Sequence, residues 1–384
     1  MELTLFVDHQ CNLRCTYCYT GRKFNRKMSR DVLDKALRLA LTSPDPHLDI
    51  AFFGGEPLLH FDLIREADEI VTRAISGSAH PPTLRWLLNT NATLLTDEIL
   101  DWSMPPRVVN VFVSMDGPPD VHDRCRLDAA GKGSYDRVFE GISKLRARGL
   151  PFRVLAVVGT NSAGDVGRIL AELLGLGAEQ VHLSPNYRDG WDQPAIERLR
   201  NGLQTATEHW MAEFRAGRTC PVEPLHTKIL THLKGGLPCP SRCLLGGREL
   251  TVVPSGNIYP CAQMVGEDQH EELVIGHVDR GLDRGRIAQL SELKDRVEGT
   301  CAPCALRNRC QSHCGCRHIA LSGKLGQSSA VLCEIEAAMI EAADRVATLL
   351  HNEQCPAFID LYYRRPWVMA SGGQLTALRR SRDA

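Results

Sequence analysis

Short apolar runs alternate with amphipathic stretches over the first two hundred residues of the chain. The apolar runs predict strands, and the stretches with helical spacing between them predict helices. The expected strands cover residues 2–7, 48–53, 84–89, 108–114, 152–158 and 180–183, and the expected helices cover residues 29–41, with Ser29 as N-cap, 61–75, 135–148 and 166–174. Six strand–helix units predict an α/β fold, a partial (β/α)6 barrel with its chemistry at the carboxyl ends of the strands.

The pattern changes after the sixth unit. Residues 193–234 carry helical spacing with no strand, and eight of the fifteen cysteines then fall between Cys239 and Cys316. Residues 249–261 predict a β-hairpin that turns at Ser255–Asn257, and residues 330–351 predict a closing helix. We therefore expect a barrel over residues 1–192, a helical bridge over 193–236, a cysteine-rich domain over 237–335, and a C-terminal helix with a partly disordered tail over 336–384.

Composition narrows the classes of function. Lys and Arg number 45 against 46 Asp and Glu, so no uniform field draws the protein to nucleic acid or to anionic lipid. No apolar run is long enough to span a bilayer, and the N-terminus lacks the basic and apolar segments of a signal peptide. We expect a cytoplasmic protein. Because the cytosol keeps thiols reduced, its clustered cysteines indicate metal binding rather than disulfides.

The first cysteine group directly follows the first predicted strand. Cys11, Cys15 and Cys18 can hold three irons of a four-iron, four-sulfur cluster, which leaves the fourth iron open to a ligand. The alternative is a structural zinc site with His9 as the fourth ligand, although zinc sites usually show two ligand pairs rather than a compact trio.

This C-x3-C-x2-C motif, with Tyr17 before the last cysteine, resembles the radical S-adenosylmethionine (SAM) superfamily. The resemblance implies that the open iron chelates the amino and carboxylate groups of SAM, and that one electron then cleaves SAM to methionine and a 5′-deoxyadenosyl radical. It also implies a set of cofactor-binding residues, which here are Tyr17, Gly54, Gly55, Glu56, Asn91, Ser114, Asp116, Arg126 and Asn161.

These residues follow successive predicted strands. The Gly54-Gly55-Glu56 segment is expected to bind the methionine amine, and Ser114 and Asp116 the ribose or carboxylate of SAM. Relatives usually have glycine after the residue matching Asn91, where this chain has Ala92. Arg126 could pair with the SAM carboxylate or form a surface salt bridge. Asn161 and Ser184 are candidates for the adenosine side or simple turn residues.

The second cysteine group carries the most specific spacing in the chain. Cys243 is followed by twelve residues, Gly256, four residues and Cys261, and a C-x2-C-x5-C-x3-C run begins at Cys301. This order resembles the SPASM domain of radical SAM enzymes that modify peptides. The family pattern implies one auxiliary cluster on Cys239, Cys243, Cys261 and Cys314, and another on Cys301, Cys304, Cys310 and Cys333. Two zinc sites of four cysteines each are the alternative.

Four further cysteines have no place in the pattern. Cys316 could be a rival ligand or a bystander, and Cys125, Cys220 and Cys355 are expected to be inert thiols, with Cys125 nearest the expected cofactor segment.

The resemblance as a whole implies an enzyme that oxidatively modifies, and crosslinks, a side chain of a ribosomally made precursor peptide. Its expected cofactors are SAM and three four-iron clusters, and its expected partners are the peptide, a reductant such as flavodoxin or ferredoxin, and possible help from a separate leader-binding protein. Sulfatase maturases carry an Asp after the cysteine that matches Cys261, where this chain has Ala262. The alternatives are a dehydrogenase or epimerase of a sugar or amino acid, and a non-catalytic iron–sulfur scaffold. No catalytic acid or base can be named.

Overall fold

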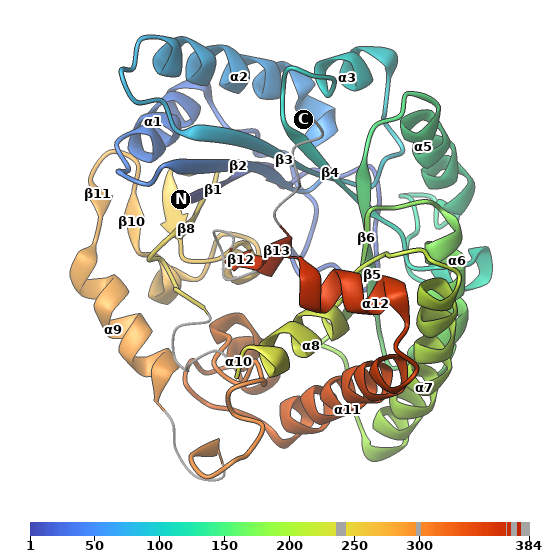
Figure 1. The fold of residues 1–384 in the computed structure, drawn as a ribbon. Coiled ribbons are helices and arrows are strands. Elements are labelled where there is room, and N and C mark those ends of the chain that lie inside the picture. Colours follow the sequence, from blue (N-terminus) through green and yellow to red (C-terminus); the bar gives the residue numbers. More distant parts are fainter. Residues whose placement is uncertain (236–242, 297–300, 366, 370–374, 378–384) are drawn as a thin grey trace. The chain divides into compact units, whose positions relative to one another are not determined.

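A computed structural model describes residues 1–235, 243–296, 301–365, 367–369 and 375–377 (Figure 1). The chain forms two compact units. The first unit comprises Met1–Leu155 and Leu244–Lys294, and the second comprises Ala156–Cys243 and Asp295–Ala384. Each is described separately below.

The first unit is built on parallel strands. They are β1 (Glu2–Asp8), β2 (His47–Gly54), β3 (Thr83–Thr90), β4 (Val109–Ser114) and β5 (Phe152–Val158), hydrogen-bonded in that order. The first unit includes β5 only as far as Leu155. Nearly all of β1 is buried, as expected of a central strand in a parallel sheet. The predicted α/β class and all five of these strands are confirmed, with ends that differ by no more than one residue.

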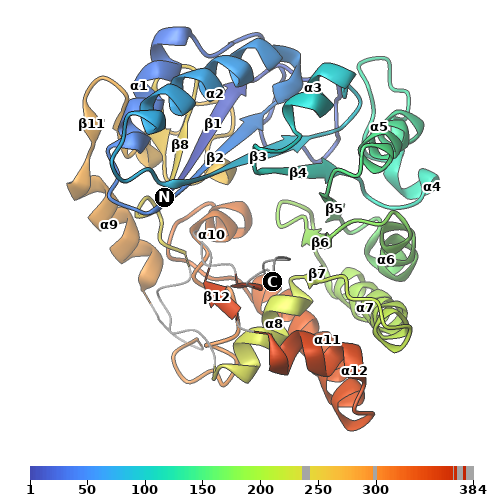
Figure 2. The same ribbon diagram turned by 45° about the horizontal axis from the view of Figure 1, so that its top comes forward.

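Helices connect these strands and lie along the sheet (Figures 1 and 2). They are α1 (Arg30–Leu41), a 3-10 turn (Pro57–His60), α2 (Phe61–Ser76), α3 (Asp97–Trp102), α4 (Pro119–His122) and α5 (Tyr135–Ala147). The predicted N-cap of the first helix is confirmed, because the Ser29 side chain accepts a hydrogen bond from the Val32 amide. The apolar faces of these helices are buried, which explains why the periodicity of the sequence located them.

Cysteine-rich sequence also contributes to the first unit. Strand β8 (Glu249–Val252) pairs in parallel with β1, and β9 (Asn257–Tyr259), β10 (Gly276–His277) and β11 (Gly281–Leu282) follow as antiparallel strands. The predicted hairpin is therefore confirmed. Its turn contains Gly256 at a φ of +90°, where a Cβ atom would lie 2.7 Å from the His277 ring. Two 3-10 turns (Ala262–Met264 and Glu271–Leu273) and α9 (Arg284–Asp295) complete this segment.

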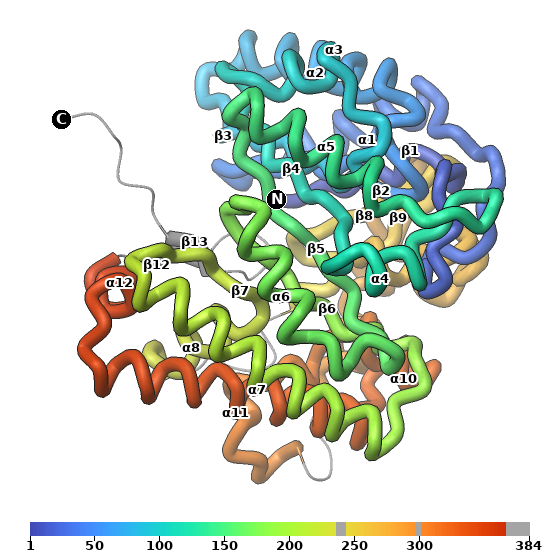
Figure 3. The backbone as a smooth tube through the Cα atoms, turned by 90° about the vertical axis from the view of Figure 1, so that its right-hand side faces the viewer, coloured from blue at the N-terminus to red at the C-terminus, as the bar shows by residue number. Residues whose placement is uncertain are grey.

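The second unit is mainly helical (Figures 1 and 3). Its elements are a 3-10 turn (Ala163–Asp165), α6 (Val166–Gly175), β6 (Gln180–Pro185), α7 (Gln193–Arg215), β7 (Val222–Glu223), α8 (Leu225–Leu233), α10 (Gly315–Ser322), α11 (Ala330–Asn352), α12 (Pro356–Ile359), a π-turn (Asp360–Arg364), β12 (Trp367–Met369) and β13 (Leu375–Ala377). Helix α11, the predicted closing helix, packs against α7 and α8. The sixth predicted strand is confirmed as β6.

One expectation about this unit is wrong. Residues 193–234 do contain a strand, because β7 pairs in parallel with β6. A strand of two residues is too short to show the period-two pattern on which strand prediction depends. The tail residues 378–384, expected to be partly disordered, lie outside the described residues. In the part of the chain that the structure describes, no helix combines the length and apolar character that crossing a membrane requires.

Candidate active site

The loop that carries the first three cysteines starts from a buried carboxylate. Asp8 ends β1 and is 1% exposed. Its Oδ1 atom accepts hydrogen bonds from the amides of Gln10 and Arg26, each at 2.9 Å, and its Oδ2 atom lies 2.6 Å from His60 Nε2. One side chain thus holds both ends of the cysteine loop and ties it to the segment after β2.

The glycine pair after β2 lies directly against this loop. The Gly55 amide donates to the Asp8 carbonyl at 2.7 Å, and the Glu56 amide donates to the Gln10 carbonyl at 3.0 Å. A Cβ atom on Gly55 would lie only 1.8 Å from the Gln10 carbonyl oxygen. Gly54 has a φ of +118°, a conformation that other residues rarely adopt. The two glycines therefore allow the backbones of the two loops to touch.

We expect Gly55→Ala to displace the cysteine loop. The added methyl group meets backbone rather than a flexible side chain, so relief requires a main-chain shift that costs about 1–3 kcal/mol. Thermal unfolding and iron content after anaerobic reconstitution measure the effect. Gly77→Ala is the matched control, because the nearest atom to its Cβ would be 4.0 Å away. A Gly55→Ala variant with the iron content and stability of wild type would contradict this account.

Glu56 organises the next strand end rather than facing solvent. Its carboxylate is 1% exposed and accepts hydrogen bonds from Thr90 Oγ1 at 2.7 Å, the Asn91 amide at 2.8 Å and the Leu58 amide at 3.2 Å. Burial raises the pKa of the Glu56 carboxyl from 4.5 to about 7, against the effect of these hydrogen bonds. The segment predicted to hold an ammonium group therefore offers chiefly its backbone carbonyls, with Glu56 bound to protein donors.

Asn91 links the third strand end to the cysteine loop. Its Nδ2 donates to Asn12 Oδ1 at 2.8 Å, and its Oδ1 accepts from Thr93 Oγ1 at 2.6 Å. Ala92 has a φ of +59°, in the left-handed region. This geometry explains why glycine suits the position in relatives, since an L side chain is strained there.

The fourth strand ends in a buried ionic cluster. Asp116 accepts from Tyr17 OH at 2.5 Å and lies 2.9 Å from Arg126 Nε, and the Arg126 guanidinium lies over the Tyr17 ring. Ser114 is the last residue of β4, two positions before Asp116, and its side chain is half-buried. A surface salt bridge is one of the two roles expected for Arg126 from the sequence. That alternative is wrong, because Arg126 is only 6% exposed and its partner Asp116 only 2%.

The backbone joins the cysteine loop to the same cluster. The Arg14 amide donates to the Leu127 carbonyl at 2.6 Å, and the Thr16 amide donates to the Cys125 carbonyl at 2.9 Å. The main chain around Cys15 is thus fixed against the segment that contains Arg126. Cys125 adjoins Arg126 in the expected cofactor segment, and its carbonyl is one of the anchors of the cysteine loop.

The three thiols differ in their electrostatic surroundings. Burial raises the pKa of Cys11 to about 12 and raises that of Cys15. At Cys18 burial acts in the same direction, but the Lys23 ammonium and hydrogen bonds from Lys23 and Thr20 together outweigh it and lower the pKa. Lys23 Nζ lies 2.9 Å from Cys18 Sγ. A cation at this position stabilises a thiolate, the form that binds iron.

No three His, Cys, Asp or Glu side chains of the described residues converge on one ion position. A four-iron cluster does not require such convergence, because each thiolate binds a different iron. His9, the suggested zinc ligand, is fully buried, and its ring lies 4.4 Å from the Phe24 ring and 4.7 Å from the Phe6 ring. Three half-buried thiols on one anchored loop, with a cation beside them, fit an iron–sulfur cluster.

The remaining cofactor candidates lie in the second unit. Asn161 follows β5 and is exposed, and Ser184 is an exposed residue of β6. Asn91 and Asp116 belong to the first unit, so the two sets are described separately. The part of Asn161 and Ser184 in binding SAM remains a prediction.

Two groups of cysteines occur in the second unit. Cys314 Sγ lies 3.1 Å from Cys316 Sγ, and hydrogen bonds from Cys243 and Cys316 lower the pKa of Cys314. Burial raises the pKa of Cys333, and the neighbouring Cys301 and Cys304 raise it further. Cys301, Cys304 and Cys333 therefore lie near one another, as expected of residues assigned to one ligand set.

Three more cysteines are expected to bind the auxiliary clusters. Cys310 is buried close enough to the Glu336 carboxylate and the Lys228 ammonium for both charges to affect its pKa. Cys261 follows β9 in the first unit, and Cys239 lies outside the described residues. The assignment of eight thiolates to two auxiliary clusters therefore remains a prediction.

Sequence reasoning missed the residues that hold the site together. Asp8 at the end of β1, Asn12 between Cys11 and Cys15, and Lys23 after Cys18 each hold the cysteine loop through a hydrogen bond, yet no motif predicted these roles. Asp8 could have been suspected, because it is a charged residue that directly follows the apolar run Leu5–Val7 in a buried strand. Lys23 carries no comparable signal, since a lysine in a polar loop is usually solvated.

Comparison with known proteins identifies the family. The protein-family model described as the radical SAM superfamily matches residues 7–174 of this chain. A cysteine-type anaerobic sulfatase-maturating enzyme of Clostridium perfringens (strain 13 / Type A) is 30% identical over 272 residues, which cover 65% of this chain and 71% of that protein. A PqqA peptide cyclase of Ruegeria pomeroyi is 25% identical over 341 residues, which cover 83% of each chain.

A solved structure agrees with these relatives. It is described as native anSMEcpe with bound AdoMet and Kp18Cys peptide, has a TM-score of 0.76 at 20% identity, and matches over 92% of this chain and all of that chain. This likeness supports the fold, and the motif residues and sequence relatives support the chemistry. The chain belongs to the radical SAM superfamily, in the subgroup that includes sulfatase-maturating enzymes and the PqqA peptide cyclase.

Proposed function

We propose that this radical SAM enzyme oxidatively modifies a side chain of a ribosomally made precursor peptide, and that it forms a crosslink. The observation that supports this proposal most directly is the anchored loop of Cys11, Cys15 and Cys18, which lies at the carboxyl ends of β1–β4. Its donor set fits a four-iron cluster with one open iron, where SAM binds. When bound, the cluster and SAM together would supply a 5′-deoxyadenosyl radical, which abstracts a hydrogen atom from a carbon of the substrate.

The protein groups around the loop have separate tasks in this proposal. Backbone carbonyls of the Gly54–Glu56 segment would hold the SAM ammonium group, and Glu56 holds Asn91 in place. Tyr17, Asp116 and Arg126 form a buried wall beside Cys15, with Ser114 and Asn161 as further SAM contacts. Glu56 and Arg126 are already bound to protein groups, so we assign them to positioning the loop and its neighbours.

The cysteine-rich sequence holds two auxiliary clusters in this proposal. One set of ligands is Cys239, Cys243, Cys261 and Cys314, and the other is Cys301, Cys304, Cys310 and Cys333. Held by these residues, the clusters would supply an acceptor for the electron that remains on the modified substrate, and a flavodoxin or ferredoxin would supply the electron that cleaves SAM. The domain boundaries predicted from the sequence belong to the same proposal. A separate leader-binding protein would explain how the peptide is recruited.

The relatives support a peptide as the substrate. One is named a peptide cyclase, and others are named for the maturation of sulfatases. The residue after Cys261 argues against sulfatase maturation. Ala262 is nearly buried and begins a 3-10 turn, so it offers no carboxylate where the sulfatase-maturating pattern has an Asp.

We expect about twelve irons per chain after anaerobic reconstitution, because eleven cysteines supply three ligands to an open cluster and eight to two closed ones. Iron and zinc analysis measures this. About four irons with about two zinc ions would overturn the two auxiliary clusters.

The substrate class has its own test. The reconstituted enzyme is incubated with SAM, a reductant and a short peptide encoded next to its gene, and deoxyadenosine and peptide mass are measured. The proposal expects deoxyadenosine together with a peptide that has lost a pair of hydrogens and resists fragmentation between the linked residues. Turnover of a free sugar or amino acid, with an unchanged peptide, would favour the small-molecule alternative.

A further inference from the structure

Lys23 extends its ammonium group to one of the three cluster thiols. Its Nζ atom lies 2.9 Å from Cys18 Sγ and also hydrogen-bonds to Thr20 Oγ1, and this hydroxyl lies 3.3 Å from the same sulfur. Cys18 therefore has a full positive charge and a hydroxyl dipole within hydrogen-bonding distance. The structure gives neither Cys11 nor Cys15 a lysine contact of this kind.

The neighbouring residues fix the position of Lys23. Arg22 hydrogen-bonds to Glu267, with Nη2 and Oε2 3.0 Å apart. The Arg26 amide is bound to Asp8, and the Arg26 guanidinium pairs with Asp268 at 3.3 Å. Because the chain is anchored on both sides, the lysine loses less conformational freedom when it contacts the sulfur.

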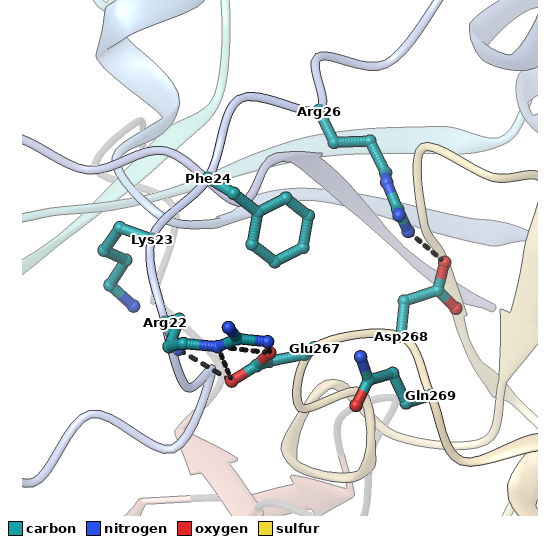
Figure 4. Close-up of a pocket in the computed structure, with 7 residues that line it drawn as sticks. All are labelled: Arg22, Lys23, Phe24, Arg26, Glu267, Asp268 and Gln269. Atoms are coloured by element: carbon teal, nitrogen blue, oxygen red, sulfur yellow. Dashed lines mark hydrogen bonds and ion pairs between the residues drawn. The ribbon is translucent and has the colours of Figure 1, made fainter.

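The acidic residues nearby are paired with other cations. Lys23 lines a cavity of about 300 Å³ together with Arg22, Phe24, Arg26, Glu267, Asp268 and Gln269. Figure 4 shows Arg22 joined to Glu267 and Arg26 joined to Asp268, with no such link from Lys23. Within the described residues, no carboxylate forms an ion pair with Lys23, so its charge acts on Cys18 without a local counterion.

We propose that Lys23 raises the reduction potential of the SAM-binding cluster through its charged hydrogen bond to Cys18. Reduction adds negative charge to a cluster, and a fixed cation at a ligand sulfur stabilises that charge. The inference rests on the proposed cluster and adds to it a positioning residue that acts through Cys18. Its effect is to make the electron that cleaves SAM easier to deliver.

The experiment is a redox titration of the reconstituted full chain by electron paramagnetic resonance. Added SAM identifies the relevant signal, because it binds only the cluster with an open iron. In Lys23→Met we expect the ratio of reduced to oxidised cluster at a fixed potential to fall at least tenfold, which corresponds to a midpoint about 59 mV more negative for one electron. Lys23→Gln keeps a hydrogen-bond donor but loses the charge, so its midpoint should also fall, whereas Lys23→Arg should stay near wild type.

Lys27→Met is the matched control. It removes a cation four residues away whose Nζ pairs with Asp62 at 2.8 Å, and it should leave the midpoint unchanged. The inference fails if Lys23→Gln retains the cluster with a wild-type midpoint, or if Lys27→Met shifts the midpoint as far. If Lys23→Met fails to assemble a cluster, the midpoint potential of Lys23→Gln tests the inference instead, and a wild-type value would overturn it. Wild-type protein without a SAM-responsive cluster would instead overturn the proposed function, and the inference with it.

Discussion

Simultaneous replacement of Cys11, Cys15 and Cys18 by Ala should reduce deoxyadenosine formation to the level seen without enzyme. Iron should fall from about twelve to about eight atoms per chain, because only the open cluster loses its ligands. Anaerobic reconstitution, iron analysis and chromatographic detection of deoxyadenosine measure both quantities. Persistent cleavage of SAM in this variant would exclude the proposed cluster.

The structure predicts that the triple variant still folds. The loop is held by backbone hydrogen bonds to Glu56, Cys125 and Leu127 and by the side chain of Asp8, none of which involves a thiol. Loss of activity is therefore a loss of ligands rather than of structure. The double variant Cys220→Ala, Cys355→Ala is the matched control, since both cysteines lie outside the ligand pattern, and it should keep its iron and its activity.

Much of the barrel was predictable because its physical signal is local. A strand of a parallel sheet is buried on both faces, and a helix that covers it has one apolar side, so both leave a periodic trace. Strand β7 was not predicted, because a strand of two residues is too short to show a period of two. The position of the cysteine loop directly after β1 was also predictable, because the C-x3-C-x2-C spacing begins where the first apolar run ends.

The partners of the predicted residues were not predictable in the same way. Glu56 and Asn91 are bound to each other although 35 residues separate them, and Asp116 is paired with Arg126, ten residues later in the chain. Nothing in a single sequence records which buried acid meets which base. Asp8 and Lys23 became recognisable only when the fold placed them beside the cysteine loop.

The second unit contains a buried ionic cluster whose loss should have a large effect on stability. Glu336 of α11 is 2% exposed, and its carboxylate lies 2.5 Å from Lys228 Nζ and 2.6 Å from Arg317 Nη1. Burial alone raises the pKa of Glu336, but the two cations outweigh it and lower the pKa from 4.5 to about 2. A lowered pKa in the folded state means that the stabilisation is fully present above pH 4.5 and is lost as the pH falls through about 2.

The same carboxylate holds the segment around Cys310. Glu336 Oε2 accepts from the Gln311 amide at 2.8 Å, and Lys228 Nζ donates to the Arg309 carbonyl at 2.8 Å. The ion pair therefore fixes the main chain on both sides of an expected cluster ligand. Damage to the ion pair should loosen that ligand as well as the helices.

Glu336→Gln should lower the free energy of unfolding at pH 7 by about 3–5 kcal/mol, because it leaves two cations with little exposure to solvent and no counter-charge. Anaerobic urea unfolding of the reconstituted protein measures the loss, and iron content reports whether the Cys310 segment still binds its cluster. The matched control is Glu334→Gln on the same helix. Glu334 is 46% exposed and pairs with Arg200 at 2.9 Å, so its loss should cost at most about 1 kcal/mol. Equal stabilities for the two variants would show that the buried charges are compensated by groups other than Glu336.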